Sequence, residues 1–508
     1  MSKVKLRLSG GLAFAANIVG YFTGFIFTVL ITRRLSAEEF GVWALISSLI
    51  VYSLIPYNLV GSWIARDAAR GKKVLDSALA LCVLLIPISI LIYFLSGVGS
   101  ASAIKEDPII ILFGIIVLVP YIFLNIGNAI QRGYMPQSIG ISRILFEISK
   151  VLLAAFFIVL LRLRLTGALL SLSLAYALQA VFLLYNSRHL CQKKINARWI
   201  VKWLKGAPIS FLGVLNDVLS ATNIVLMSVI LGSAAIAGYW QAALAVSALA
   251  TSSKLLTTGL GARLLSGGSQ KDVDKSFSFS MMLATPLLLG FLVLSKDLLW
   301  ILRPTYSVAW VAACILAIAG VVRIIGDVGA TVLYGTDEFD RSELVTLKDY
   351  LKSRVFLVNG LRVTLTGLNI ASVGIYLLLI RNAADIIEVI ISIAVINLIY
   401  AIARMVINLK LMKKITGFKL NFANLKLYLI ASTIMAIAVY TLRSALGPIS
   451  TKVLEAAPPI LLLVVVGALI YGGMLYLISK EFREFLREAW SFISNYGLSN
   501  FLLPENNH

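Results

Sequence analysis

Cysteine, histidine and charge are all scarce in this chain of 508 residues. Its three cysteines, Cys82, Cys191 and Cys314, lie far apart, and two of them fall in apolar runs, so neither a disulfide framework nor a cysteine metal site is indicated. Two histidines, His189 in a loop and His508 at the terminus, exclude a histidine-rich metal centre. We therefore expect the protein to work without a metal or an organic cofactor.

Only 14% of the residues are charged, whereas 59% are hydrophobic, and the mean hydropathy is +0.93. Soluble domains are about a quarter charged and about half apolar, so no soluble core would absorb this surplus. Apolar runs of about 20 residues, the length that crosses a bilayer as a helix, recur from end to end. The chain is therefore predicted to be an all-α, polytopic membrane protein. Its first apolar run is too long for a signal peptide and is expected to remain as a transmembrane helix.

Fourteen apolar segments follow one another along the chain. They cover residues 11–32, 40–63, 77–97, 108–130, 138–161, 167–186, 207–231, 237–262, 277–300, 308–333, 355–380, 386–408, 427–446 and 457–479. If the N-terminus is inside, most Lys and Arg of the loops are cytoplasmic, which predicts that both termini are cytoplasmic. The same bias explains the formal charge of +21 without a nucleic-acid partner. We expect a multi-pass protein of the cell membrane.

A short motif occurs twice and indicates two halves of similar design. Ser36-Ala37-x-x-x-Gly41-x-Trp43 returns as Ser233-Ala234-x-x-x-Gly238-x-Trp240, and each copy joins one apolar segment to the next. The predicted organisation is an N-terminal six-helix lobe (1–186), a basic connector (187–206), a C-terminal six-helix lobe (207–408), two additional helices (409–479) and a cytosolic tail (480–508).

Two basic or amphipathic stretches are expected to lie along the cytosolic leaflet. In the connector, Trp199 and Trp203 stand beside Lys202 and Lys205, as in an interfacial helix, although an ordinary solvated loop is the alternative. In the tail, residues 480–496 space large apolar side chains at helical intervals, which predicts a second surface helix.

Nine ionisable residues fall inside the apolar segments, and they hold most of the functional information. They are Arg143, Glu147, Lys150, Asp217, Lys254, Arg323, Asp327, Arg362 and Arg404. A charge at the centre of a membrane helix costs about 2.5–3.5 kcal/mol by insertion measurements. So many charges are not expected to face lipid.

Some of these charges have local explanations. Arg143 with Glu147 and Arg323 with Asp327 are spaced i, i+4, so each pair can neutralise itself on one helix. Arg404 is close to the predicted cytosolic end of its segment, where its side chain would reach the headgroups.

Lys150 and Asp217 lie deepest in their segments, and Arg362 is intermediate. Because Lys150 and Asp217 are the deepest and the hardest to explain in other ways, we expect each to face a hydrated cavity.

Cations outnumber carboxylates six to three among the nine residues, so a cavity lined by them would attract an anion such as a phosphate or pyrophosphate. The substrate-binding candidates are Arg143, Lys150, Lys254, Arg323 and Arg362. The carboxylates that would either orient these cations or exchange H⁺ or Na⁺ are Asp217, Glu147 and Asp327. A weaker polar lining is predicted from Asn17, Asn216 and Asn223, for which hydrogen-bonded helix packing is an equal alternative.

The first 75 residues resemble the polysaccharide-transport flippases of the multidrug, oligosaccharidyl-lipid and polysaccharide exporter superfamily. The resemblance lies in Asn17, in the turn Thr32-Arg33-Arg34-Leu35-Ser36-Ala37-Glu38-Glu39-Phe40-Gly41-Val42-Trp43, and in Ile64-Ala65-Arg66-Asp67. Asp217 with Gly232 and Gly238-Tyr239-x-x-Ala242, and the stretch from Tyr306 to Ala309, are similar to the family's second lobe.

This resemblance implies two six-helix lobes around a central cation-lined cavity, through which lipid-linked sugars pass to the outer leaflet by alternating access. Helices beyond the usual twelve are associated with the lipid tail in the peptidoglycan-precursor flippases. The first helix here lacks an intramembrane arginine, which argues against a peptidoglycan precursor as substrate. The expected partners are the bilayer, an anionic lipid-linked oligosaccharide and polysaccharide assembly enzymes.

Other functions are weighed against the same residues. A drug or cation exporter would favour a cavity rich in carboxylates, whereas cations dominate here. A glycan polymerase or glycosyltransferase would need a sizeable external loop with acidic or histidine catalysts, and all the predicted external loops are short, so we expect no enzyme activity. A non-transporting scaffold would pair off its deep charges in a closed interior.

Overall fold

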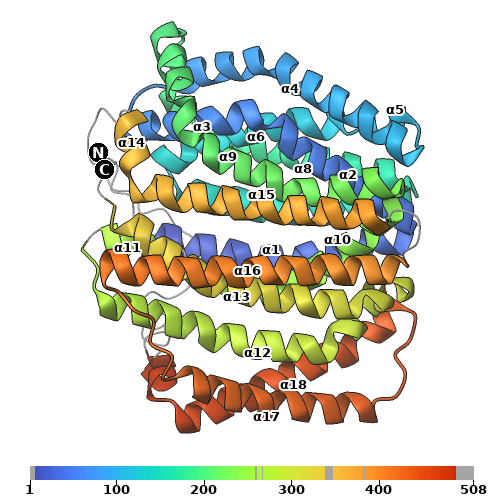
Figure 1. Cartoon of the computed structure of the whole chain (residues 1–508). Coiled ribbons are helices and arrows are strands. Elements are labelled where there is room, and N and C mark those ends of the chain that lie inside the picture. The colour runs from blue at the N-terminus through green and yellow to red at the C-terminus, as the bar shows by residue number, and fades with distance from the viewer. Residues whose placement is uncertain are drawn as a thin grey trace, which may run out of the picture.

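The computed structural model describes residues 6–257, 260–265, 267–337, 347–380, 385–484 and 486–487. In these ranges the chain is a bundle of helices that run side by side (Figure 1). The first half comprises α1 (Leu6–Arg34), α2 (Ala37–Ser53), α3 (Ile55–Ala69), α4 (Leu75–Ile104), α5 (Pro108–Leu112), α6 (Ile115–Tyr134), α7 (Gln137–Ala154), the π-helix η1 (Ala155–Leu160) and α8 (Arg164–Asn186).

The second half begins with the short η2 (Arg188–Leu190) and, like the first half, consists of helices. It comprises α9 (Ala197–Leu231), α10 (Ala234–Ala250), η3 (Ser252–Thr257), α11 (Leu260–Leu265), α12 (Gln270–Leu302), η4 (Pro304–Ala309), α13 (Trp310–Gly335), α14 (Leu347–Lys352), α15 (Arg354–Ile380) and α16 (Ile386–Thr416). The last two helices are α17 (Leu425–Ala445) and α18 (Val453–Ile478).

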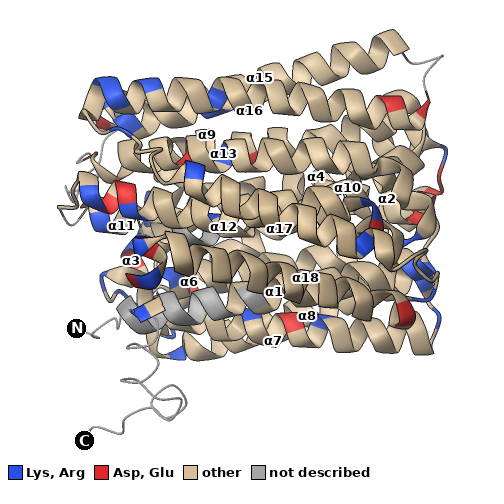
Figure 2. Ribbon diagram, turned by 90° about the horizontal axis from the view of Figure 1, so that it is seen from below, with Lys and Arg blue, Asp and Glu red and all other residues tan. Residues whose placement is uncertain are grey.

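The predicted fold class is confirmed, because the predicted apolar segments fall on these helices. Ten helices in the described ranges are long and apolar enough to cross a bilayer, and α2 with α3, which are bent by 55° relative to each other, are so when taken together. The remaining segments correspond to α1, to α7 with η1, and to α10, a shorter apolar helix. Lys and Arg gather toward the ends of the bundle, while its middle is mostly uncharged (Figure 2).

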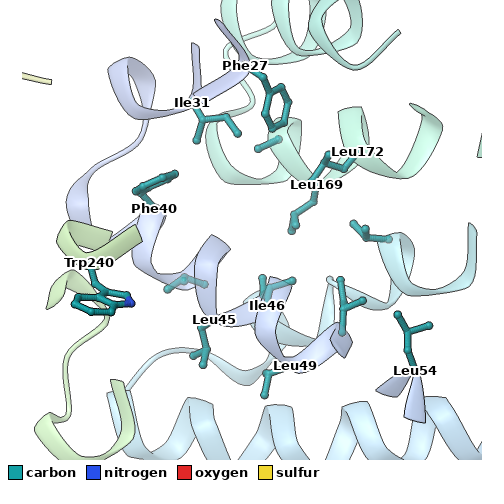
Figure 3. Packing of buried hydrophobic residues seen from close by; sticks show 14 of the residues in the cluster. Phe27, Ile31, Phe40, Leu45, Ile46, Leu49, Leu54, Leu169, Leu172 and Trp240 are labelled. Atoms are coloured by element: carbon teal, nitrogen blue, oxygen red, sulfur yellow. The ribbon is translucent and has the colours of Figure 1, made fainter. Parts of the chain in front are cut away.

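The two copies of the sequence motif meet each other in space. A Cβ added at Gly41 of α2 would lie 1.8 Å from the Ala234 carbonyl oxygen, and one added at Gly238 of α10 would lie 2.3 Å from the Ala37 carbonyl oxygen. This reciprocal contact needs glycine in both copies, since any side chain would clash with backbone. The repeat therefore marks the place where α2 and α10 cross, and Trp240 of α10 lies beside the α2 core (Figure 3).

A second contact between the halves closes the same end of the bundle. The Arg33 guanidinium donates to the carbonyls of Trp300 (3.0 Å) and Ile301 (2.8 Å) at the end of α12, where the last helical carbonyls lack intrahelical partners. Arg303 donates in return to the Leu35 carbonyl. In the predicted topology this is the outer end, so the lobes are joined there.

The connector differs from its prediction. Residues 197–205 are not a separate interfacial helix but the first turns of α9, which continues without a break to Leu231. Trp203 is fully buried, and its indole donates to Asp67 of α3 (2.9 Å), which also pairs with Lys202 (3.0 Å) and Lys72 (2.8 Å). These tryptophan and lysine side chains hold α9 against α3 instead of the membrane surface.

The two additional helices pack on α12 (Figure 1). Arg443 of α17 forms two hydrogen bonds with Asp297 of α12, at 2.7 and 3.0 Å. Tyr471 of α18 donates to the carbonyl of Met282. The predicted surface helix over residues 480–496 lies largely outside the described residues.

Candidate functional site

The predicted charges of the second half converge on Asp327 of α13, and glycines permit this. A Cβ added at Gly326 would lie 2.9 Å from the Met405 Cα, so α13 and α16 touch backbone to backbone and Arg404 is carried next to Asp327. At Gly320 an added Cβ would lie 2.2 Å from the Thr251 side chain, so the chain after α10 also approaches closely. That approach places Lys254 of η3 at the same carboxylate.

Three cations from three other helices lie within 4.0 Å of Asp327. Arg404 Nη2 is 2.5 Å from Oδ1, Lys254 Nζ is 3.2 Å from Oδ2, and Arg362 Nη2 of α15 is 4.0 Å from Oδ1. Arg323 stands one turn before Asp327 on α13, and its Nε donates to the Ala319 carbonyl (3.3 Å). We call Asp327, Lys254, Arg323, Arg362 and Arg404 the C-lobe cluster.

The C-lobe cluster carries a formal surplus of positive charge, and its cations are partly exposed. Four basic residues stand around one carboxylate, and the exposed side-chain fractions are 59% for Lys254, 31% for Arg362 and 18% for Arg404. Side chains of this kind donate charge-assisted hydrogen bonds to oxyanions, and arginine does so with two parallel donors. The arrangement can hold an anion with several oxygens.

The first half holds a smaller cluster, which is closed. Glu147 and Lys150 of α7 are 5% and 7% exposed, and Lys150 Nζ lies 2.5 Å from Glu147 Oε2. Thr23 of α1 donates to the same oxygen (2.7 Å), and the Lys150 ammonium lies over the rings of Phe27 and Phe146 at 5.2 and 4.9 Å. We call Glu147, Lys150 and Thr23 the N-lobe cluster.

Three predictions about the charges are corrected by this geometry. Lys150 does not face a hydrated cavity in this structure, because Glu147 and two aromatic rings enclose it. Glu147 forms its ion pair with Lys150 at i+3, not with Arg143, which is exposed. Asp327 forms its ion pairs with cations of other helices, and within the described residues Arg323 forms none with it at 4 Å or less.

Arg404 is the site residue that the sequence analysis missed. Its predicted position near a helix end suggested that it reaches the headgroups, but α16 runs on to Thr416 through the basic residues that had been assigned to a loop. Arg404 therefore lies within the helix and away from its end, and it makes the shortest ion pair with Asp327. A lysine-rich extension of the apolar segment at helical spacing is the signal that points to the longer helix.

The remaining candidates lie outside both clusters. Asp217 is exposed midway along α9, and within the described residues it has no ion pair. Asn216 accepts a hydrogen bond from Thr366 of α15 (3.1 Å), which favours the helix-packing alternative for this residue. Asn17 is partly buried and has an interaction partner. Asn223 has a buried amide oxygen without a hydrogen-bond partner among the described residues.

A cavity of about 200 Å³ lies within the first half, between α2, α6 and α8. Tyr121 and Tyr176 line it together with aliphatic side chains, and the Tyr176 ring stacks on Phe146 at 4.8 Å. Its lining is mainly apolar, so it differs in chemistry from the C-lobe cluster.

Solved transporter structures share this architecture. An inward-facing multidrug resistance MATE family transporter of the MOP superfamily matches with a TM-score of 0.58 at 13% identity, over 80% of this chain and 99% of its own. The chain therefore shares its fold with this transporter. The lipid II flippase MurJ, in an inward closed conformation, matches with a TM-score of 0.56 at 14% identity, over 94% of this chain and 100% of its own.

A third structure with this fold is a MOP superfamily transporter from Pyrococcus furiosus, for which reverse polarity of the binding pocket suggests a different function (TM-score 0.50, 13% identity, 81% of this chain and 98% of its own). No family model and no curated protein matches the chain. The larger share of this chain that MurJ covers agrees with helices beyond the two six-helix lobes. At these identities the likeness establishes the fold, and the function must be argued from the site.

Proposed function

We propose that the protein is a flippase that moves a polyprenyl-(pyro)phosphate-linked oligosaccharide from the cytosolic to the outer leaflet of the cell membrane by alternating access. The observation that carries this proposal is the C-lobe cluster, in which Arg404, Lys254 and Arg362 lie within 4.0 Å of a single carboxylate. Such a surplus inside membrane-spanning helices is costly unless an anion enters the site. A phosphate or pyrophosphate headgroup meets that need.

The arrangement of the two ends supports loading from the cytosol. Lys254, the most exposed member of the cluster, follows α10 at the end of the bundle where α1 begins. At the opposite end, Arg33 and the glycine contact between Gly41 and Ala234 join the lobes. With the predicted cytoplasmic termini, this arrangement supports loading of a headgroup from the inside.

A drug or cation exporter is the rival function, since the same fold serves a multidrug transporter. A cationic drug would be repelled by the C-lobe cluster, and the buried Glu147 of the N-lobe cluster is already paired. For the P. furiosus transporter with this fold, reverse polarity of the binding pocket suggests a different function. Here the polarity favours an anion.

The proposal includes no chemical step. Binding and movement require the cations of the C-lobe cluster, while Asp217 is the candidate for H⁺ or Na⁺ coupling. The enzymes that assemble the glycan inside and use it outside are the expected partners.

Transport in proteoliposomes tests the proposal. The probe is a fluorescent sugar on a short polyprenyl pyrophosphate, and the neutral control substrate carries the same sugar on an uncharged lipid. Purified protein is expected to move the pyrophosphate probe, and Arg323→Gln is expected to slow it while Lys452→Gln, which removes an exposed positive charge (77% exposed) outside the cluster, is not. Equal movement of both lipids, or export of a cationic dye instead, would refute the proposed substrate.

A further inference from the structure

Asp327 occupies the centre of the C-lobe cluster, where the anionic part of a substrate would have to sit. We infer that Asp327 is an exchangeable counter-ion: it holds Arg404, Lys254 and Arg362 together while the site is empty and releases them to phosphate oxygens when the substrate binds. This inference rests on the proposed function, and it assigns Asp327 as a positioning residue that sets affinity and release.

The geometry of the carboxylate supports exchange. Asp327 Oδ1 faces Arg404 and Arg362, at 2.5 and 4.0 Å, and Oδ2 faces Lys254 at 3.2 Å. A phosphate oxygen accepts hydrogen bonds from the same donors at the same distances. Arg362, at 4.0 Å, is beyond hydrogen-bond range and is held only by charge, so an oxyanion with a second negative charge would attract it more strongly than the aspartate does.

A second ion pair, between Asp297 of the C-terminal lobe and Arg443 of α17, has the geometry of a fixed contact. Asp297 of α12 receives two hydrogen bonds from one arginine, Arg443, which also donates to the Gly447 carbonyl (2.7 Å). The two aspartates have similar exposed side-chain fractions, 13% for Asp297 and 16% for Asp327. Asp297 is matched to one cation, whereas Asp327 is shared among three from different helices. Asp297 is therefore a matched control.

Charge decides which anions can displace Asp327. A monoanion would only replace the one negative charge that the aspartate already supplies. Pyrophosphate carries at least two negative charges and has more oxygens, so it can satisfy the cations better than the carboxylate does. The site is therefore selective for anions with two or more charges, and Asp327 lowers their affinity enough to permit release on the far side.

The test measures binding of inorganic pyrophosphate and of farnesyl pyrophosphate to the full chain in nanodiscs, together with transport of the probe described above. For Asp327→Asn we expect pyrophosphate affinity to rise about tenfold, while the maximal transport rate falls because release is slowed. Asp327→Glu keeps the charge and is expected to bind like the wild type. Asp297→Asn is expected to leave both affinities unchanged. Tighter binding of farnesyl pyrophosphate alone would identify a lipid headgroup, and not free pyrophosphate, as the ligand.

Equal or weaker binding of both inorganic pyrophosphate and farnesyl pyrophosphate by Asp327→Asn would overturn the inference and make Asp327 a fixed organiser of the cations. If that variant does not fold, Asp327→Asn combined with Lys254→Gln restores the charge balance, and it must bind more tightly than Lys254→Gln alone. Failure of the wild type both to bind pyrophosphate and to move the probe would instead refute the proposed function, so the two failures are distinguishable.

Discussion

The two lobes differ in how many cations surround their carboxylate and in how exposed these charges are. In the N-lobe cluster one carboxylate, Glu147, meets one lysine and a threonine, and both charges are less than 10% exposed. In the C-lobe cluster one carboxylate, Asp327, meets three cations, and Lys254 is 59% exposed. A balanced, buried pair fixes α1 against α7, whereas the unbalanced cluster has more cations than its carboxylate neutralises, as the proposed function requires. The difference separates packing from function within helices of similar composition.

The largest loss of stability is expected from a change at Lys150. Lys150→Met leaves Glu147 buried without a cation, and breaking a buried pair on one side costs roughly 3–5 kcal/mol. Thermal unfolding of the purified protein should show this loss, and Glu147→Gln with Lys150→Met should recover most of it. An unchanged unfolding temperature for the single variant would mean that the N-lobe cluster is not structural.

A change at Arg404 should instead reduce transport and leave stability almost unchanged. Arg404→Gln removes a charge-assisted hydrogen bond worth about 1.5–3 kcal/mol, so kcat/KM for transport should fall by roughly 10- to 100-fold. Lys254 and Arg362 still face Asp327, so the unfolding temperature should change little. A transport loss that follows the loss of folded protein, or one matched by Lys452→Gln, would remove Arg404 from the site.

One glycine near each cluster allows the two lobes to be compared directly. Gly326→Ala places a methyl group 2.9 Å from the backbone Cα of Met405, whereas Gly20→Ala places one 3.2 Å from Glu147 Oε1, the movable end of a side chain. Overpacking costs about 1–3 kcal/mol and alanine regains about 1 kcal/mol of helix propensity. We expect a net loss of about 1 kcal/mol and slower transport for Gly326→Ala, and nearly wild-type stability for Gly20→Ala. Equal unfolding temperatures would contradict the close packing of α13 on α16.

The smallest effect is expected at Arg362, which is 31% exposed and 4.0 Å from Asp327. Partly exposed ion pairs contribute about 0.2–1 kcal/mol, so Arg362→Gln should raise the half-saturating concentration of the probe only a few fold. Because salt screens such interactions, the difference from wild type should vanish near 1 M NaCl. A difference that persists in high salt would indicate a direct hydrogen bond to the substrate.

Hydropathy and loop charge were sufficient to predict the spans, because membrane helices must be long and apolar whatever they pack against. The repeated motif also predicted two halves, although nothing in the sequence showed that Gly41 and Gly238 meet each other's motifs. Eight of the nine charges lie on long helices at the predicted segments, whereas Lys254 lies on the short η3, which follows α10. The predicted pairing was wrong. Spacing on one helix suggested Arg143 with Glu147 and Arg323 with Asp327, whereas neighbouring helices supply the partner of Asp327.

Those partners depend on how closely the helices approach one another. Glycines such as Gly326 set that distance, and the spacing of residues along a single helix does not reveal it. Arg404 was misjudged for a related reason: a basic stretch was read as a loop, while the helix continues through it.

The central claim is that the C-lobe cluster binds the headgroup and the N-lobe cluster does not. One transport measurement compares two charge-neutralised proteins in proteoliposomes with the pyrophosphate-linked probe. The first carries Lys254→Gln, Arg362→Gln and Arg404→Gln, and the second carries Glu147→Gln and Lys150→Gln. We predict that the first protein loses transport while it still folds, and that the second protein keeps transport. Sustained transport by the first protein, or its loss in a folded second protein, would contradict it.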